Sequence, residues 1–104
     1  VQSNTEVEAL RAYLSEKHYT ILDEKMVFDG FYYQIISFNG KYHEAYDQMQ
    51  INYGPILLKN KDEVFLSYLK YNYEKLKKIN ESAHKKEFEE KMKEIDKLLY
   101  NLSL

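Results

Sequence analysis

The chain has 104 residues, a length that fits one small domain whose core is sufficient for independent folding. Its 15 basic and 17 acidic residues give a net charge of −2, so no overall field marks a nucleic-acid or membrane-binding protein. Cysteine is absent, which excludes disulfides, thiolate catalysis and cysteine-based zinc sites. No apolar run approaches the length of a membrane span, so no membrane partner is expected.

Lysine outnumbers arginine by 14 to one, and Asn, Ile and Tyr are also abundant. These residues have AT-rich codons, which indicates a low-GC bacterium or one of its phages or plasmids. The absence of cysteine favours a cytoplasmic protein. A secreted form released by processing stays open, because the sequence begins with Val1 and not with Met.

The first part of the chain has apolar residues at helical spacing, Val7, Leu10 and Leu14, which predicts a helix over residues 5–18. Two hairpin dipeptides follow, Asp29-Gly30 and Asn39-Gly40. Both supply the positive φ angles of a type I′ turn, and they bracket a run rich in aromatic and β-branched residues. This segment therefore predicts a three-stranded antiparallel meander.

The two turns fix a register in which Phe28 faces Phe31 and Phe38 faces Lys41. One sheet face is then a core face and carries Met26, Phe28, Phe31, Tyr33, Ile35, Tyr42 and Tyr46. Glu24, Ser37 and Glu44 interrupt it. The opposite face is amphipathic, with Lys25, Val27, Tyr32, Gln34, Ile36, Phe38, Lys41, His43, Ala45 and Asp47.

Residues 42–53 also fit a helical stripe, but the Asn-Gly turn favours a strand as far as about residue 48. After a turn at Gly54-Pro55, the apolar run 56–58 predicts a fourth strand. Two helical stripes then fall out of phase near residues 80–82, which predicts helices over 61–80 and 83–102 with Ser82 as a cap. One long bent helix is the alternative, because no Gly or Pro enforces a stop.

The predicted fold is a single α+β domain spanning residues 1–104. It has an N-terminal helix, a three- to four-stranded antiparallel β-meander over about residues 20–58, and a C-terminal helical hairpin.

No known catalytic motif is present. His43, Glu44 and Asp47 form the best acidic cluster with an imidazole. On a strand, Glu44 points to the opposite face from His43 and Asp47, so the three cannot share one metal ion. We therefore expect no catalytic residues, no metal, no cofactor and no enzymatic activity.

The amphipathic sheet face is the leading candidate for partner binding, through Tyr32, Ile36, Phe38, Lys41 and His43. The alternative is that the C-terminal hairpin buries this face as core. Tyr71 on the predicted second helix is a further candidate, because it lies near Lys70, Lys75 and Lys78 and aromatic rings beside lysines can stack on bases.

The predicted function is that of a non-enzymatic protein-binding module, such as an inhibitor, immunity or accessory protein. Its partner would be another protein, and a homodimer through the last helix is a further option. Nucleic acid is not expected as the partner. Weak nucleic-acid binding through the Tyr and Lys surface of the C-terminal helices is the alternative function.

Overall fold

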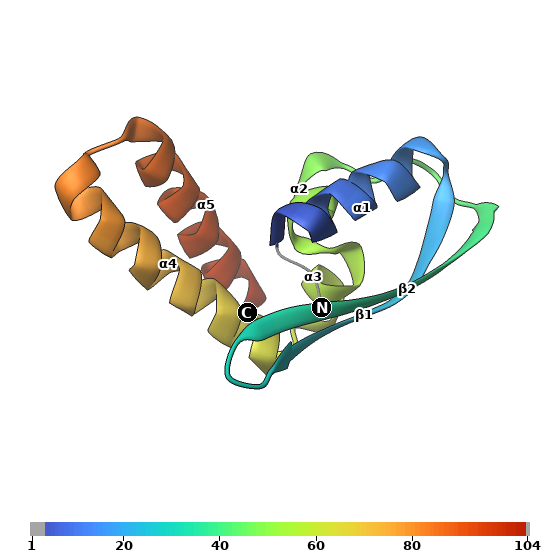
Figure 1. Cartoon of the computed structure of the whole chain (residues 1–104), viewed down its shortest axis with the longest axis horizontal. Coiled ribbons are helices and arrows are strands. Elements are labelled where there is room, and N and C mark those ends of the chain that lie inside the picture. Colours follow the sequence, from blue (N-terminus) through green and yellow to red (C-terminus); the bar gives the residue numbers. More distant parts are fainter. Residues whose placement is uncertain (1–3, 104) are drawn as a thin grey trace. The chain divides into compact units, whose positions relative to one another are not determined.

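The computed structural model describes residues 4–103 (Figure 1). The elements in chain order are α1 (Asn4–Glu16), β1 (Tyr19–Phe28), β2 (Tyr32–Tyr42), α2 (Gln48–Tyr53), α3 (Pro55–Asn60), α4 (Glu63–Ala83) and α5 (Lys86–Leu102). They fall into two compact units, the first ending at Asp62 and the second beginning at Glu63. The prediction of a three- to four-stranded meander is wrong, because β1 and β2 alone form a sheet in the described part of the chain.

The β1–β2 hairpin has a different register from the predicted one. Phe28 pairs with Tyr32, not with Phe31, so the connection is a three-residue loop with Gly30 at φ 76°. The amide of Asp29 closes this loop by donating to the carbonyl of Phe31 at 3.0 Å. Because strand side chains alternate, this shift of one residue turns every β2 side chain to the other face. Ile36 therefore lies on the core face, and Ile35 lies opposite.

Asn39-Gly40 does not form the second predicted turn, since β2 continues through it to Tyr42. Thr20 pairs with Asn39, and Tyr19 pairs with Tyr42. The β2 residues between Asn39 and Tyr42 therefore form an irregularity in the ladder. The side chain of Asn39 accepts a hydrogen bond from the amide of Lys41 at 3.0 Å. The Asn-Gly pair therefore accommodates a β-bulge and does not reverse the chain.

Two short helices stand where the sequence predicted strands. Asp47 caps α2 and forms a capping box with Gln50, whose amide donates to the Asp47 carboxylate at 2.8 Å. The helical alternative for residues 42–53 therefore holds for α2. Residues 56–58 lie in α3, with Pro55 at its first turn, where a missing N–H costs nothing.

The core of the first unit gathers Leu14, Ile21 and Tyr46 with half-buried apolar neighbours, Leu10, Tyr19, Ile36, Ile51 and Ile56. The hydroxyl of Tyr46 accepts the amide of Ile21 at 2.9 Å, and the amide of Tyr46 donates to Ser15 Oγ at 2.8 Å. These bonds hold α1, β1 and the segment before α2 together around one aromatic ring.

The second unit is a helical hairpin of α4 and α5, with Phe65, Tyr68, Leu69 and Ile95 among its buried side chains. Asn80 lies in the last turn of α4 and satisfies the amides that follow the helix: its carbonyl accepts the amide of His84 at 2.9 Å, and its side-chain oxygen accepts the amide of Lys85 at 2.7 Å. The predicted cap at Ser82 is wrong, because α4 continues to Ala83 and Lys85 is the residue before α5.

Candidate functional site

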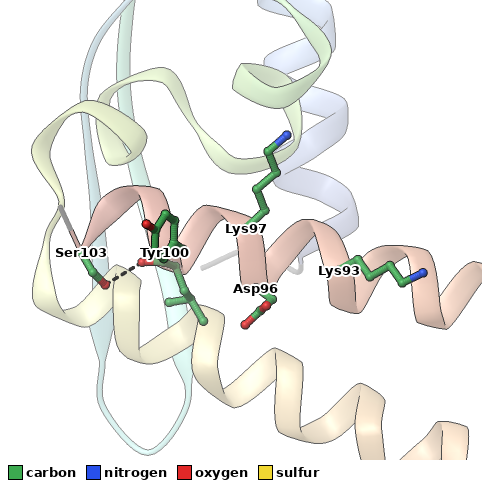
Figure 2. Close-up of a pocket in the computed structure, with 6 residues that line it drawn as sticks. Lys93, Asp96, Lys97, Tyr100 and Ser103 are labelled. Atoms are coloured by element: carbon green, nitrogen blue, oxygen red, sulfur yellow. Dashed lines mark hydrogen bonds between the residues drawn. The ribbon is translucent and has the colours of Figure 1, made fainter.

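One face of α5 carries an open depression of about 560 Å³ in the second unit (Figure 2). Its lining residues are Lys93, Asp96, Lys97, Leu99, Tyr100 and Ser103. Lys93, Lys97 and Tyr100 have the i, i+4, i+7 spacing of one helix face. The Tyr100 side chain is 68% exposed. Within residues 4–103, neither Lys93 nor Lys97 forms an ion pair, so both ammonium groups are accessible.

A similar stripe lies on α4. Tyr71, Lys75 and Lys78 repeat the i, i+4, i+7 spacing, all three are exposed, and Tyr71 is 53% exposed. Each helix of the hairpin therefore presents one tyrosine and two lysines along one side. Lysine ammonium groups contact phosphates and tyrosine rings stack on unpaired bases, so this combination suits single-stranded or looped nucleic acid.

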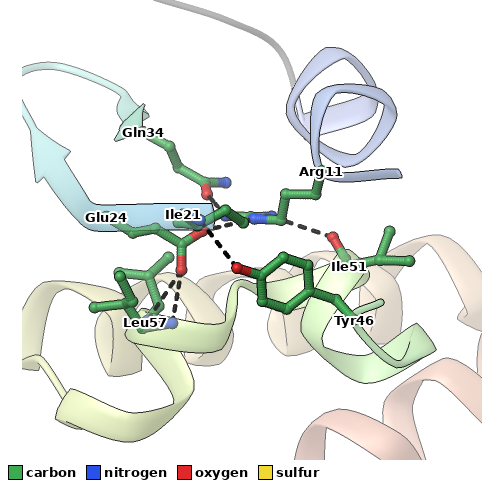
Figure 3. Close-up of polar contacts among 8 residues, drawn as sticks. Arg11, Ile21, Glu24, Gln34, Tyr46, Ile51 and Leu57 are labelled. Carbon is green, nitrogen blue, oxygen red and sulfur yellow. Dashed lines mark hydrogen bonds and ion pairs between the residues drawn. The ribbon is translucent and has the colours of Figure 1, made fainter. Parts of the chain in front are cut away.

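The first unit contains a buried ion pair (Figure 3). Arg11 of α1 is the one arginine of the sequence, and its Nε lies 2.7 Å from Oε2 of Glu24 in β1. Both side chains are 1% exposed. A charge buried this deeply requires an opposite charge and hydrogen bonds, because it has lost its hydration.

Further hydrogen bonds satisfy the remaining groups of this ion pair. Arg11 Nη1 donates to the carbonyl of Ile51 at 3.3 Å, and Nη2 donates to Oε1 of Gln34. Oε1 of Glu24 accepts the amides of Ile56 at 2.7 Å and Leu57 at 3.4 Å. We call this set the Arg11 node. It connects α1, both strands, α2 and the first turn of α3.

Because Gly54 has no side chain, it leaves the space that the Arg11 node occupies. A Cβ atom at this position would lie 2.8 Å from Arg11 Nη2 and from both carboxylate oxygens of Glu24. The residue also has φ 103°, a conformation that L side chains rarely adopt. The Gly54-Pro55 turn therefore contacts the ion pair directly, which the sequence alone did not reveal.

Two sequence signals pointed toward the Arg11 node. Glu24 is one of three residues that interrupt the predicted core face, and Arg11 is a lone arginine in a lysine-rich chain. An arginine suits this place, because its planar guanidinium donates in several fixed directions at once.

The predicted partner-binding residues are divided between the two units. Ile36 packs against the core cluster, and Tyr32 is half-buried with its ring 4.8 Å from that of Phe28. Phe38, Lys41 and His43 are exposed near the other end of β2. Tyr71 lies on α4, in the second unit. Their role in partner binding stays a prediction.

His43 does not act with Glu44 and Asp47 as one group. Its ring stacks on Tyr46 with centroids 4.5 Å apart, and Asp47 caps α2. Residues 4–103 contain no group of three His, Asp or Glu side chains arranged to hold a metal ion. None of the helices in that range is both long and apolar enough to cross a membrane.

The fold resembles that of solved methyltransferases. TrmK of M. capricolum, in complex with S-adenosyl-homocysteine, is 27% identical with a TM-score of 0.75, over 97% of this chain and 46% of that chain. Streptococcus pneumoniae Sp1610, in complex with S-adenosyl-L-methionine, is 21% identical with a TM-score of 0.77, over 92% and 44%. The B. subtilis m1A22 tRNA methyltransferase TrmK is 22% identical with a TM-score of 0.60, over 92% and 45%. The architecture is thus that of part of a Rossmann-like methyltransferase.

The family model of TrmK, tRNA (adenine(22)-N(1))-methyltransferase, matches residues 1–103, and the chain belongs to this family. No curated protein matches the chain. The chain spans less than half the length of the solved relatives.

Family membership corrects several predictions. The expectation of a non-enzymatic inhibitor, immunity or accessory module is wrong, because the family consists of tRNA methyltransferases. The expectation that nucleic acid is not a partner is wrong for the same reason. The net charge of the whole chain hides the lysine-rich part, since it averages a first unit rich in acidic residues with a second unit rich in lysine.

Proposed function

We propose that this chain is part of an enzyme that methylates N1 of adenine 22 in tRNA. The observation that carries the proposal is the family match, which covers residues 1–103. Such an enzyme would work in the cytoplasm on transfer RNA and would use S-adenosyl-L-methionine, the molecule bound to the Streptococcus pneumoniae relative.

The described residues do not fit the methyl donor. Nucleotide-type cofactors are held in enclosed sites with glycine-rich turns, and the three glycines of this chain serve the hairpin loop, the bulge and the Arg11 node. The depression on α5 is open and lined by lysines. No step of methyl transfer is therefore assigned to residues 4–103.

The α4–α5 hairpin is the part of the chain best suited to contact the RNA. Residues 63–103 hold nine lysines and eight acidic residues, whereas residues 4–62 hold six basic and nine acidic residues. The stripe from Tyr71 to Lys78 and the stripe from Lys93 to Tyr100 place ammonium groups and aromatic rings on the same helix faces. We expect the lysines to contact phosphates and the tyrosines to stack on unpaired bases of tRNA.

A methylation assay tests the proposed function. The complete protein is incubated with S-adenosyl-L-methionine and a tRNA transcript that has adenine at position 22, and the product is mapped by mass spectrometry of RNase fragments. We expect one methyl group on N1 of that adenine. A matched transcript with guanine at position 22 should receive none. Methylation at another nucleotide, or no methylation of a correctly folded tRNA, would contradict the proposal.

A further inference from the structure

Asn39-Gly40 is the one Asn-Gly pair of the sequence, and it lies outside the helices. In such a pair the main-chain nitrogen of the glycine can attack the side-chain amide carbon of the asparagine, because glycine has no Cβ atom to obstruct the approach. The other six asparagines within residues 4–103 belong to helices, and each is followed by a residue with a side chain. Helical hydrogen bonds also fix the main chain around them. Asn39 is therefore the asparagine most open to this attack.

The β-bulge gives the Asn39-Gly40 pair more freedom than a regular ladder would. Asn39 pairs with Thr20 and Tyr42 with Tyr19, so the two β2 residues between them have no counterpart in β1. Gly40 is exposed to solvent. Among the described residues, a Cβ atom added to it would contact one side-chain atom, Tyr19 Cε1 at 3.9 Å. Water therefore reaches the pair, and the main chain there can move without meeting close neighbours.

A hydrogen bond holds the two reacting groups near each other. The amide of Lys41 donates to Oδ1 of Asn39 at 3.0 Å. The ring of atoms that this bond closes includes both the Asn39 side-chain carbon Cγ and the Gly40 nitrogen, so the side chain is folded toward the nitrogen that would attack it. The same N–H points at the oxygen on which negative charge develops during the attack, as the donors of an oxyanion hole do.

We propose that Asn39 is a site of spontaneous deamidation. The deprotonated Gly40 nitrogen forms a bond to Asn39 Cγ, the C–N bond of the side-chain amide breaks, and ammonia leaves. The product is a five-membered succinimide. Water then adds to one of its two carbonyl carbons and opens the ring, which leaves aspartate or isoaspartate at position 39. One water is consumed and one ammonia is released, so the reaction requires no cofactor and is independent of the proposed function.

The two products have different effects on β2. Aspartate keeps a side-chain oxygen that can accept the same amide as Asn39 does, so the bulge can persist. Isoaspartate adds one carbon atom to the main chain before Gly40 and displaces the residues that follow. Among these, the amide of His43 donates to the carbonyl of His18 at 2.8 Å and joins the end of β2 to the turn before β1. Isoaspartate should weaken this connection.

Peptide mapping of the aged protein tests the proposal. The complete protein is kept folded at mildly alkaline pH and then digested with trypsin, which releases residues 26–41 as one peptide with Asn39 as its one asparagine. We expect this peptide to gain the mass difference between an acid and an amide about tenfold faster than the peptides that contain the helical asparagines. The rate should be no slower in the folded protein than in urea. A folded rate about tenfold below the rate in urea would overturn the inference, because the structure would then protect the pair.

Two variants provide the matched controls. Gly40→Ala makes only an ordinary contact at 3.9 Å and should fold, but its methyl group obstructs the attacking nitrogen, and we expect deamidation to slow by about tenfold. An unchanged rate in this variant would also overturn the inference. Asn39→Asp supplies the charge of the product without the extra main-chain carbon. Ageing should lower the thermal midpoint of the unmodified protein more than Asn39→Asp does, and equal losses would contradict the role given to isoaspartate.

Discussion

Single residues determine how the first unit is held together. The ion pair of Arg11 and Glu24 is buried, and its hydrogen bonds connect elements from α1 to α3. A buried pair of this kind contributes little net free energy, but removing one partner leaves an uncompensated charge in a place that water does not reach. The Arg11 node therefore specifies the arrangement of the elements more than it adds to their stability.

Arg11→Met should reduce the free energy of unfolding by about 3–5 kcal/mol, because Glu24 loses the guanidinium that neutralises it. Arg11→Lys keeps the charge but not the three donor directions, so a smaller loss is expected. Urea denaturation followed by circular dichroism measures both. A loss for Arg11→Met below about 1 kcal/mol would show that the pair does not constrain the fold, since that is the range of exposed pairs.

The three glycines form a graded series for a second measurement. Gly54→Ala adds both an unfavourable backbone angle and contacts at 2.8 Å with the Arg11 node, and should cost about 2–4 kcal/mol. Gly30→Ala adds only the angle, because no atom lies within 4 Å, and should cost about 1 kcal/mol. Gly40→Ala has neither problem and serves as the control. Equal losses for Gly30→Ala and Gly54→Ala would contradict the steric role of Gly54.

Among the elements, the α4–α5 hairpin carries the surface that suits RNA. Each of its two stripes contains one tyrosine and two lysines. Their spacing places all three residues on one side of the helix. The acidic residues between them prevent a continuous basic patch. Contacts with RNA should therefore be few and individually measurable.

Lys93→Ala with Lys97→Ala should weaken tRNA binding and make it less sensitive to salt. Each lost phosphate contact lowers the slope of log K against log salt by about 0.7–0.9, so the double variant should lose about 1.5. Fluorescence anisotropy over a salt series measures this slope. Lys91→Ala is the control on the same helix, because Lys91 pairs with Glu94 at 3.1 Å. An unchanged slope in the double variant would exclude this side of α5 from the interface.

Under the proposed function, the whole enzyme has two separate tasks, which are to bind the tRNA and to select the base that is methylated. Phosphate contacts position a nucleic acid without reading its sequence, whereas the methylated base must be recognised by its own edge. The lysine and tyrosine stripes belong to the described residues, whereas these residues do not fit the methyl donor.

A tRNA with guanine at position 22 should therefore bind the complete enzyme with an affinity within about threefold of the adenine form, while losing methylation. Anisotropy titration and the methylation assay, run on the same transcripts, check this together. If the guanine transcript loses most of its binding, base recognition and not phosphate contact dominates the affinity.

Local features of the fold could be predicted from the sequence. Helical periodicity located the two C-terminal helices to within three residues of their ends, and the stripe of Tyr71, Lys75 and Lys78 was visible from spacing alone. Asn80 near the break between the helices was also apparent. These features depend on contacts within one turn of helix, so neighbouring residues are sufficient to predict them.

The number of strands in the sheet and their register depended on long-range contacts that the sequence does not show. Asp29-Gly30 lies in a three-residue loop, whereas Asn39-Gly40 forms a bulge. Two dipeptides that both predict a turn therefore adopt different structures. The register depends on which face of β2 packs against the core. A shift of one residue exchanges the two faces. The Arg11 node depends on residues up to 46 positions apart, from Arg11 to Leu57, which no local pattern can bring together.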